Sequence, residues 1–401
     1  MPESQYPYFC VECSQVTPGK ADTPRFLLIM PIGIGDAVAV GSTMVDQIIK
    51  NDPEAWGSID IMCNEVQAEL FQYDPRMNRI IRVDRVLFPN FDSRTWIRGI
   101  IRNPEAAPLV HFLRKRRYEA IFPGLFAPAL YYRLHAPLVF PGAFQIVRDF
   151  WALRKHVDRP ISKTTRQLVN AYFQNKLPEP EIDEEIPLYL SAEHVQEAMA
   201  AVARIKEIAP VPREKSRLLV VGPDTTSIVT RPPTHLLADG IAGALRSVPD
   251  LLVSILPSYT DTRASKNLWH ALSTDFADRL FLMSSDPRPS LLETSTFIDQ
   301  ADIFLTGDTG LMHLATATKK LGKADSTVYT PRNSVKIIAI FGGTNPGLYG
   351  YSKRTLILGR GRKEQMQVGP NIFKEAYNSS SRDFFDHISP CQVTEAILSV
   401  L

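Results

Sequence analysis

The residues best suited to chemistry lie where an apolar run meets a helical segment, near residue 310. Gly-Asp-Thr-Gly-Leu-Met-His at 307–313 follows the apolar run 302–306, and the apolar spacing predicts a helix over 311–317. The first backbone N–H groups of such a helix lack partners within it and favour anions. Asp308 can accept from sugar hydroxyls, Thr309 can donate to phosphate, and Gly310 allows close approach. The pattern predicts a site for a phosphate-bearing ligand.

The same residues also allow a purely structural interpretation. Asp and Thr are preferred helix N-cap residues, so Asp308 or Thr309 can serve only to cap the helix. His313 would then be a core histidine with satisfied hydrogen bonds. The two interpretations differ in whether a ligand occupies the turn.

A second strand-to-helix turn lies near the start of the chain. The run 25–30 is strand-like, and Pro-Ile-Gly-Ile-Gly-Asp-Ala-Val at 31–38 leads into a helix predicted to extend to about residue 50. The carboxylate of this turn, Asp36, can take a proton as a general base or cap the helix. Both roles can hold at once.

The glycines of this turn allow a different interpretation, dinucleotide binding. Gly33 and Gly35 match the first two glycines of that fingerprint, but Val38 occupies the third position. No acidic residue clearly ends a second strand at the expected spacing. An NAD- or FAD-dependent oxidoreductase is therefore disfavoured.

Two motifs together resemble a known family. Asp-Thr-Gly-x-x-His-Leu-Ala at 308–315, followed by an apolar strand and Gly-Gly-Thr-Asn-Pro at 342–346, resembles the heptosyltransferase-like glycosyltransferases, glycosyltransferase family 9. The Gly-Asp turn at 35–36 resembles the first loop of that family. The resemblance implies an α/β chain with two Rossmann-like domains facing a cleft, the GT-B architecture. It also implies an inverting, metal-independent enzyme that moves a heptose-like sugar from a nucleotide-diphosphate sugar, such as an ADP-heptose, to a hydroxyl acceptor.

The resemblance also implies roles for individual residues. Asp36 would be the general base, with Gly33 and Gly35 forming its loop at the cleft. Where the family carries a lysine near the donor phosphates, this chain has Thr230 and then Arg231, so the cation is displaced by one position or absent. No cofactor and no metal are implied. The residues expected to bind the donor are Thr225, Thr226, Arg231, Asp308, Thr309, Gly310, Leu311 and His313.

Alternating strand-like and helical segments predict parallel sheets covered by helices. Strands are expected at 58–63, 78–83, 117–122 and 137–140, and again at 218–221, 251–256, 279–283, 303–306 and 337–341. A proline-rich acidic stretch at 177–187 has the composition of a linker. The expected organisation is an extension at 1–24, an acceptor domain at 25–187, a donor domain at 188–388 and a closing helix at 389–401. The segment 319–334 is longer than the family leads us to expect, and we expect it to reshape the sugar pocket.

Composition bounds the class of protein. The 401 residues are 44% hydrophobic, with no run of 18 apolar residues and a polar start, so we expect a cytoplasmic protein. Cys10 and Cys13 form a C-x-x-C that could be half of a zinc site, but Cys63 and Cys391 are single. Reduced thiols without metal are therefore expected.

One part of the chain is strongly basic. Residues 76–176 carry nineteen Lys or Arg against six Asp or Glu, a net charge of +13 in a chain whose total is +2. The densest run is Arg114, Lys115, Arg116 and Arg117, which can be a solvated helix end or a contact for an anionic partner. An anionic glycan or glycolipid acceptor, or peripheral contact with the inner face of a membrane, would explain the excess. No nucleic-acid-binding module is present, so nucleic acid is not an expected partner.

A second class of function stays open. A catalytically silent protein of the same fold would bind a nucleotide sugar without transferring it. Asp36 and the 308–315 motif argue against this alternative, whereas the missing lysine argues for it. Turnover of nucleotide sugars separates the two.

Overall fold

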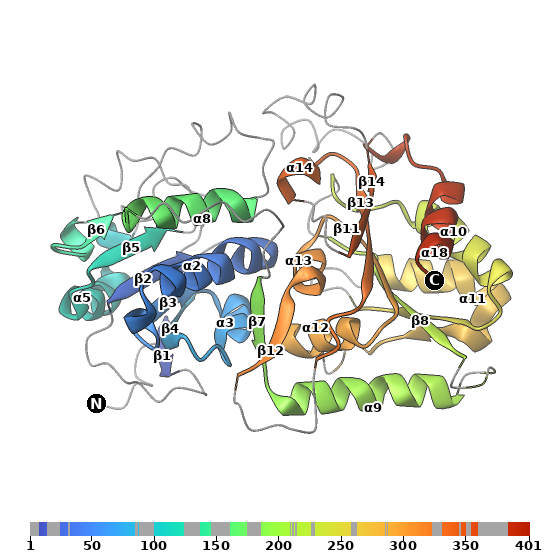
Figure 1. The fold of residues 1–401 in the computed structure, drawn as a ribbon, viewed down its shortest axis with the longest axis horizontal. Helices are drawn as coiled ribbons and strands as arrows, with labels where there is room; N and C mark the ends of the chain where they lie inside the picture. Colours follow the sequence, from blue (N-terminus) through green and yellow to red (C-terminus); the bar gives the residue numbers. More distant parts are fainter. Residues whose placement is uncertain are drawn as a thin grey trace. The chain divides into compact units, whose positions relative to one another are not determined.

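The computed structural model describes most of the 401 residues. The described residues are 8–13, 25–30, 33–84, 87, 100–123, 137–145, 161–174, 186–208, 210, 212, 215–225, 229–257, 263–284, 286, 288–322, 331–344, 346–349, 354–359 and 384–401. The chain forms two compact units, one of residues 1–191 and 320–326 and the other of 192–319 and 327–401. Each unit is built around one sheet (Figure 1).

The sheet of the first unit has the strand order β1-β4-β3-β2-β5-β6. All neighbouring strands are parallel except β1, which pairs with β4 in antiparallel register. The strands are β1 (Phe9–Cys13), β2 (Phe26–Met30), β3 (Ile59–Cys63), β4 (Met77–Val83), β5 (Ala120–Pro123) and β6 (Phe144–Gln145). Without β1, this order is that of a Rossmann-like sheet, in which the strand order reverses between β2 and β5.

Helices cover both faces of this sheet, which explains why β2 and β3 are buried along their whole length. Leu109 and Leu113 of α5 pack in one core cluster with Leu27 and Ile29 of β2. On the other face, Phe26 meets Tyr172 of α8 edge-on. The helical segments are α1 (Ile34–Asp36), the π-helix η1 (Ala37–Ser42), α2 (Thr43–Asn51), η2 (Pro53–Ala55), α3 (Glu65–Phe71), η3 (Pro104–Ala106), α5 (Ala107–Arg116) and α8 (Ile161–Tyr172).

The sheet of the second unit is fully parallel, in the order β10-β9-β8-β11-β13-β14. This strand order is that of a Rossmann fold: successive strands are added on one side of β8 and then, from β11, on the other side, so the strand order reverses between β8 and β11. The strands are β8 (Arg217–Gly222), β9 (Leu251–Ile255), β10 (Leu280–Leu282), β11 (Ile303–Gly307), β13 (Lys336–Phe341) and β14 (Thr355–Gly359). A separate two-stranded sheet pairs β7 (Pro187–Leu190) with β12 (Thr318–Leu321).

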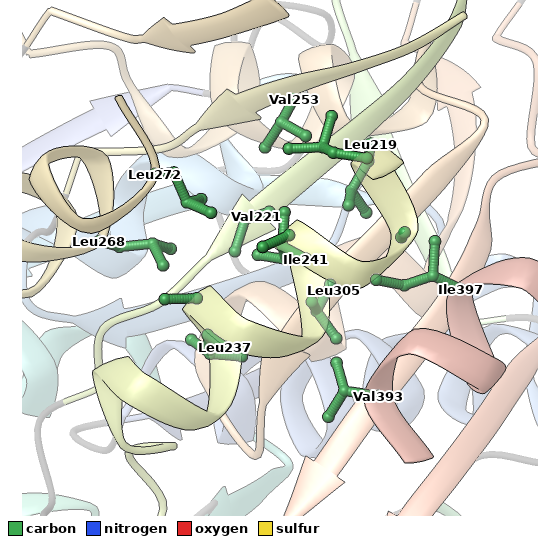
Figure 2. Packing of buried hydrophobic residues seen from close by; sticks show 14 of the residues in the cluster. Leu219, Val221, Leu237, Ile241, Val253, Leu268, Leu272, Leu305, Val393 and Ile397 are labelled. Carbon is green, nitrogen blue, oxygen red and sulfur yellow. The ribbon is translucent and has the colours of Figure 1, made fainter. Parts of the chain in front are cut away.

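Three helices cover one face of this sheet and enclose its core. Figure 2 shows Leu219 and Val221 of β8 among side chains from α10, α11 and α18. The C-terminal helix packs closely on α10 at Gly240. A Cβ atom at this position would lie only 2.6 Å from the Val393 side chain. The helices of the unit are α9 (Ala192–Ile208), α10 (Thr234–Ser247), α11 (Arg263–Phe276), η4 (Ala277–Arg279), α12 (Leu291–Asp299), α13 (Gly310–Thr316), α14 (Pro346–Tyr349) and α18 (Pro390–Val400).

Most of the predicted strands form, but one prediction is wrong. Residues 137–139 are helical, and the strand after β5 is Phe144–Gln145 instead. Val139 and Phe140 are buried in the α5 core cluster, so their apolar pattern reports burial rather than strand conformation. Strands β1, β7, β12 and β14 were not predicted.

The division between the units falls after Ser191. The boundary expected from the sequence, between 187 and 188, lies within β7. Of the expected linker 177–187, residues 177–185 lie outside the described residues. The segment 320–326 belongs to the first unit although its neighbours on both sides belong to the second.

Candidate functional site

The predicted donor residues of the second unit lie at adjacent strand ends. β11 pairs with β8 on one side and with β13 on the other, so the carboxyl ends of these three strands lie side by side. They lead into the segments 222–225, 307–310 and 342–344. In open α/β sheets, ligands bind beyond the carboxyl ends of strands at the point where strand order reverses, which here lies between β8 and β11. The sheet therefore brings Thr225 and Asp308–Gly310 to the same edge.

A loop segment, residues 229–232, lies against two of these strand ends. A side chain at Gly307 would overlap the Thr230 carbonyl oxygen, and one at Gly342 would lie 2.8 Å from the Val229 carbonyl oxygen. Gly343 N–H donates to that Val229 oxygen at 3.1 Å. Gly307, which ends β11, and Gly342, which follows β13, thus leave room for the backbone of residues 229–232.

The same loop is closed by an ion pair that the sequence did not predict. Arg231 Nε lies 2.9 Å from Asp224 Oδ1, and Arg231 Nη2 donates to the Thr225 carbonyl oxygen at 2.5 Å. The Thr225 and Thr230 hydroxyls are 2.7 Å apart. Asp224 is almost fully buried and Arg231 is one-third exposed, and the carboxylate partly compensates the charge of the guanidinium. Thr226, the other predicted hydroxyl, lies outside the described residues.

Thr309 caps the helix that follows the motif. Its Oγ1 accepts from the N–H groups of Leu311 and Met312 at 3.1 and 3.4 Å, and its backbone is extended. The Thr306 hydroxyl donates to the Gly222 carbonyl oxygen at 3.0 Å, which ties the end of β11 to the end of β8. A hydroxyl that accepts from two amides keeps its own hydrogen for donation, so capping leaves Thr309 able to donate to a phosphate oxygen. Leu311 is buried against the backbone at Gly222.

His313 is buried and neutral. Burial lowers the pKa of its imidazole to about 4. Its Nε2 lies 4.0 Å from Asp308 Oδ1, beyond hydrogen-bond distance, and both side chains are almost fully covered. Because the imidazole is neutral near pH 7, the two groups do not form an ion pair. Asp308 therefore stands beside a polar but uncharged neighbour.

The Gly-Asp turn of the first unit starts a helix earlier than expected. Gly33 is the N-cap of α1, and the Ala37 N–H donates to its carbonyl oxygen at 3.0 Å. Asp36 is the third residue of that helix, so the alternative that Asp36 is the N-cap is wrong. The side chain of Asp36 lies outside the described part of the chain. Gly35 lies inside the same short helix.

The predicted basic run lies at the end of α5. Arg114 and Lys115 are exposed, and the Arg116 guanidinium lies 4.5 Å from the centre of the Phe112 ring. Arg117 ends the helix in left-handed conformation, with φ of 50°. Arg114 Nε donates to the Leu138 carbonyl oxygen. The run is thus an exposed helix end with local contacts.

Part of the positive charge of residues 76–176 is buried or paired with carboxylates. Arg76 is 2% exposed, and its Nη2 lies 2.6 Å from Asp74 Oδ2. Arg82 pairs with Glu12, which lies outside the basic segment 76–176. The net charge of that segment therefore overstates the positive charge on the surface.

The C-x-x-C lies in β1. Cys10 is half-buried, and Cys13 is the last residue of that strand. Within the described ranges, no three His, Cys, Asp or Glu side chains come together as metal ligands. In the same ranges, no helix is both long and apolar enough to cross a bilayer.

No protein-family model and no curated protein matches this sequence. Solved structures do resemble it over nearly its whole length. ADP-heptose LPS heptosyltransferase II of E. coli is 16% identical, with 94% of this chain and 98% of that chain covered and a TM-score of 0.61. A glycosyl transferase family 9 protein of Veillonella parvula is 13% identical, with 96% and 99% covered and a TM-score of 0.62. E. coli heptosyltransferase WaaC with ADP is 16% identical, with 88% and 99% covered and a TM-score of 0.54.

These likenesses concern the fold. They agree with the two Rossmann-like sheets and with the sequence resemblance to glycosyltransferase family 9. The chain has the α/β GT-B architecture, and the predicted fold class is confirmed.

Proposed function

We propose that this protein is a glycosyltransferase that takes its sugar from a nucleotide-diphosphate sugar. The observation that carries the proposal is the meeting of Thr225 and Asp308–Gly310 at the point where strand order reverses in the second unit. The solved proteins of the same fold support it, because two of them are named as heptosyltransferases and one of these was solved with ADP. An ADP-heptose-like donor is accordingly the first candidate.

The proposed donor-site residues would bind different parts of the nucleotide sugar. Asp308 would accept hydrogen bonds from sugar hydroxyls, while Thr225, Thr309 and backbone N–H groups at the strand ends would donate to the diphosphate. Arg231 would supply positive charge, reduced by its pairing with Asp224. The buried neutral His313 would help hold Asp308 in place.

We propose an inverting reaction that needs no metal or cofactor. Asp36 would take the proton of the acceptor hydroxyl while the acceptor oxygen bonds to the anomeric carbon. The bond from that carbon to the diphosphate oxygen breaks, and the diphosphate leaves with the electron pair. Donors at the strand ends would stabilise the negative charge that develops on it.

The acceptor side of the proposal rests on charge. The exposed run Arg114–Arg117 would attract an anionic glycan or glycolipid at the inner face of a membrane, so we place the protein in the cytoplasm with peripheral membrane contact. The heptosyltransferase II of the same fold is named for lipopolysaccharide, an anionic glycolipid. Nucleic acid is not a proposed partner.

The alternative of a silent nucleotide-sugar binding protein rests on one observation, the compensated charge of Arg231. A panel of nucleotide sugars, with mass spectrometry for released nucleotide and for glycosylated lipopolysaccharide, separates the two. Release of nucleoside diphosphate together with a glycosylated product supports the transferase. Binding of a nucleotide sugar without release in any acceptor mixture supports the silent protein, and no binding at all contradicts both.

A further inference from the structure

The four carbonyl groups at the C-terminal end of α13, the helix that follows the Asp308–Gly310 turn, all accept hydrogen bonds. The last four carbonyls of a helix have no partner within it. Here each one accepts a hydrogen bond: His313 from the Ala317 N–H at 3.1 Å and the Thr316 hydroxyl at 2.9 Å, Leu314 from Ser295 Oγ at 3.4 Å, Ala315 from Lys319 Nζ at 2.9 Å, and Thr316 from Arg354 Nη2 at 3.1 Å. Two of these donors are cations, which a helix C-terminus favours.

Lys319 is the unusual member of this set, because it is 2% exposed. Burying an ammonium group is costly unless charge and hydrogen bonds compensate for it. The charged groups that face it are the buried carboxylate of Asp299, which favours its protonated form, and Arg354, which opposes it. Burial is the largest effect, and together with Arg354 it outweighs Asp299 and lowers the pKa of Lys319 to about 8. Its ammonium donates to the Ala315 carbonyl oxygen at 2.9 Å.

Asn333 fixes the backbone of Lys319. The Lys319 N–H donates to Asn333 Oδ1 at 2.8 Å, and Asn333 Nδ2 donates to the Lys319 carbonyl oxygen at 2.9 Å. The Asn333 N–H in turn donates to the Asp299 carboxylate at 2.9 and 3.1 Å. Asn333 and Arg354 both have positive φ, 51° and 61°, a conformation that costs free energy outside glycine. The surroundings thus hold strained backbone in place around one lysine.

We infer that Lys319 is a positioning residue for the donor site: its ammonium holds the last turn of α13, and the helix transmits that constraint to the Asp308–Gly310 turn. This inference rests on the proposed function of that turn. With seven residues α13 is about 10 Å long, too short to bend appreciably, so a shift at one end moves the other. Lys319 and Asn333 belong to the segment 319–334, which is expected from the sequence to reshape the sugar pocket, and they supply contacts at the C-terminal end of this helix.

Hydrogen exchange of the ligand-free protein tests the anchor without reference to function. Lys319→Met keeps the length of the side chain and removes its charge and hydrogen bond. We expect amides of 311–317 to exchange at least about tenfold faster, and those of α10 to exchange as before, since the variant loses a hydrogen bond from a charged donor at this turn only. Lys320→Met, at an exposed neighbour, is the matched control. Unchanged exchange over 311–317 would overturn the inference.

Binding of ADP measured by calorimetry between pH 6.5 and 9.5 tests the link to the site. Wild-type affinity should fall as the pH rises through about 8, where Lys319 loses its proton, and Lys319→Met should bind more weakly at pH 7 without that alkaline fall. If Lys319→Met does not fold, the wild-type profile and Lys319→Gln give the same comparison. Equal affinity and equal pH dependence in wild type and variant would overturn the positioning role. If the wild type binds no ADP or nucleotide sugar, the proposed function fails, whereas the exchange experiment still decides the anchor.

Discussion

Asp36 is the third residue of a helix whose N-cap is Gly33, and it is the residue proposed as the general base. We therefore expect Asp36→Asn to lower kcat by about 10²–10⁴ while leaving donor affinity unchanged, because a general base acts in the transition state. Steady-state transfer rates and calorimetry with the nucleotide sugar measure the two effects. Glu65→Gln, at an exposed carboxylate starting α3, is the control. Wild-type turnover in Asp36→Asn would assign the carboxylate a structural role only.

The donor turn gives a graded expectation. Asp308→Ala should weaken donor binding by about tenfold or more through loss of hydrogen bonds to a charged acceptor. His313→Ala should weaken it less, because the imidazole would act only through its position beside Asp308. Gly310→Val should be the most severe, since its side chain would fill the space proposed for phosphate. Calorimetry with the nucleotide sugar ranks the three, and unchanged affinity in all three would move the donor site elsewhere.

Burial of His313 makes stability depend on pH. Its pKa is lowered from 6.5 to about 4, so the unfolded chain binds a proton more readily than the folded protein between these values. Stability should accordingly be lost as the pH falls from about 6.5 to 4, by about 3 kcal/mol for a fully buried group. Thermal unfolding of wild type and His313→Asn over this range is the measurement. The variant should be less sensitive to acid, and parallel curves would contradict the assignment.

At the scale of single residues, the sequence predicts groups whose partners are near in the chain. Thr309 and the amides it caps are two or three residues apart, so the motif alone predicts the cap. The Asp224–Arg231 pair spans a loop whose path depends on room left by Gly307. No local pattern predicts that path, and Asp224 was missed for this reason.

At the scale of elements, the glycine that ends β11 leaves room for the neighbouring loop 229–232. Gly307→Ala would place a methyl group on the Thr230 carbonyl oxygen and so displace residues 229–232. We expect donor affinity to fall by at least tenfold and stability by about 1–3 kcal/mol, as for other overpacked sites. Denaturant unfolding and donor calorimetry measure both. Wild-type values for both quantities would show that the loop does not lie against β11 in solution.

Elements were predictable where apolar runs are long and flanked by turn residues. β8, β9, β11 and β13 follow such runs, and all form as expected. No residue of β14 is fully buried, and β1 joins the sheet through pairing with β4, so neither has the pattern of a strand buried on both faces. The π-helical turn η1, directly after the Gly-Asp turn, was not predicted either. Such turns are rare and frequently lie at functional sites, which suits the proposed role of Asp36.

At the scale of the whole molecule, two Rossmann-like sheets were predictable because strand and helix alternate in each half. The return of 320–326 to the first unit was not, since it depends on pairing between β12 and the distant β7. Charge is likewise a property of the whole chain that only structure can apportion. Arg76 and Arg82 contribute to the basic segment but are paired, whereas Arg114 and Lys115 are exposed.

This exposed charge leads to the prediction that tests acceptor capture. Replacing Arg114, Lys115, Arg116 and Arg117 by Gln should lower the kcat/KM for an anionic acceptor by about tenfold at low salt and leave donor affinity unchanged, because steering by charge acts on encounter. Salt should reproduce the loss in the wild type, since exposed charges are screened over about 8 Å at physiological ionic strength. The matched control removes four exposed cations of the second unit, Arg204, Arg246, Lys266 and Lys336. The acceptor kcat/KM across a salt series and co-sedimentation with anionic vesicles are measured for all three proteins. If the two quadruple variants behave alike, the run at the end of α5 is an ordinary solvated surface, and the acceptor must then be sought among neutral molecules.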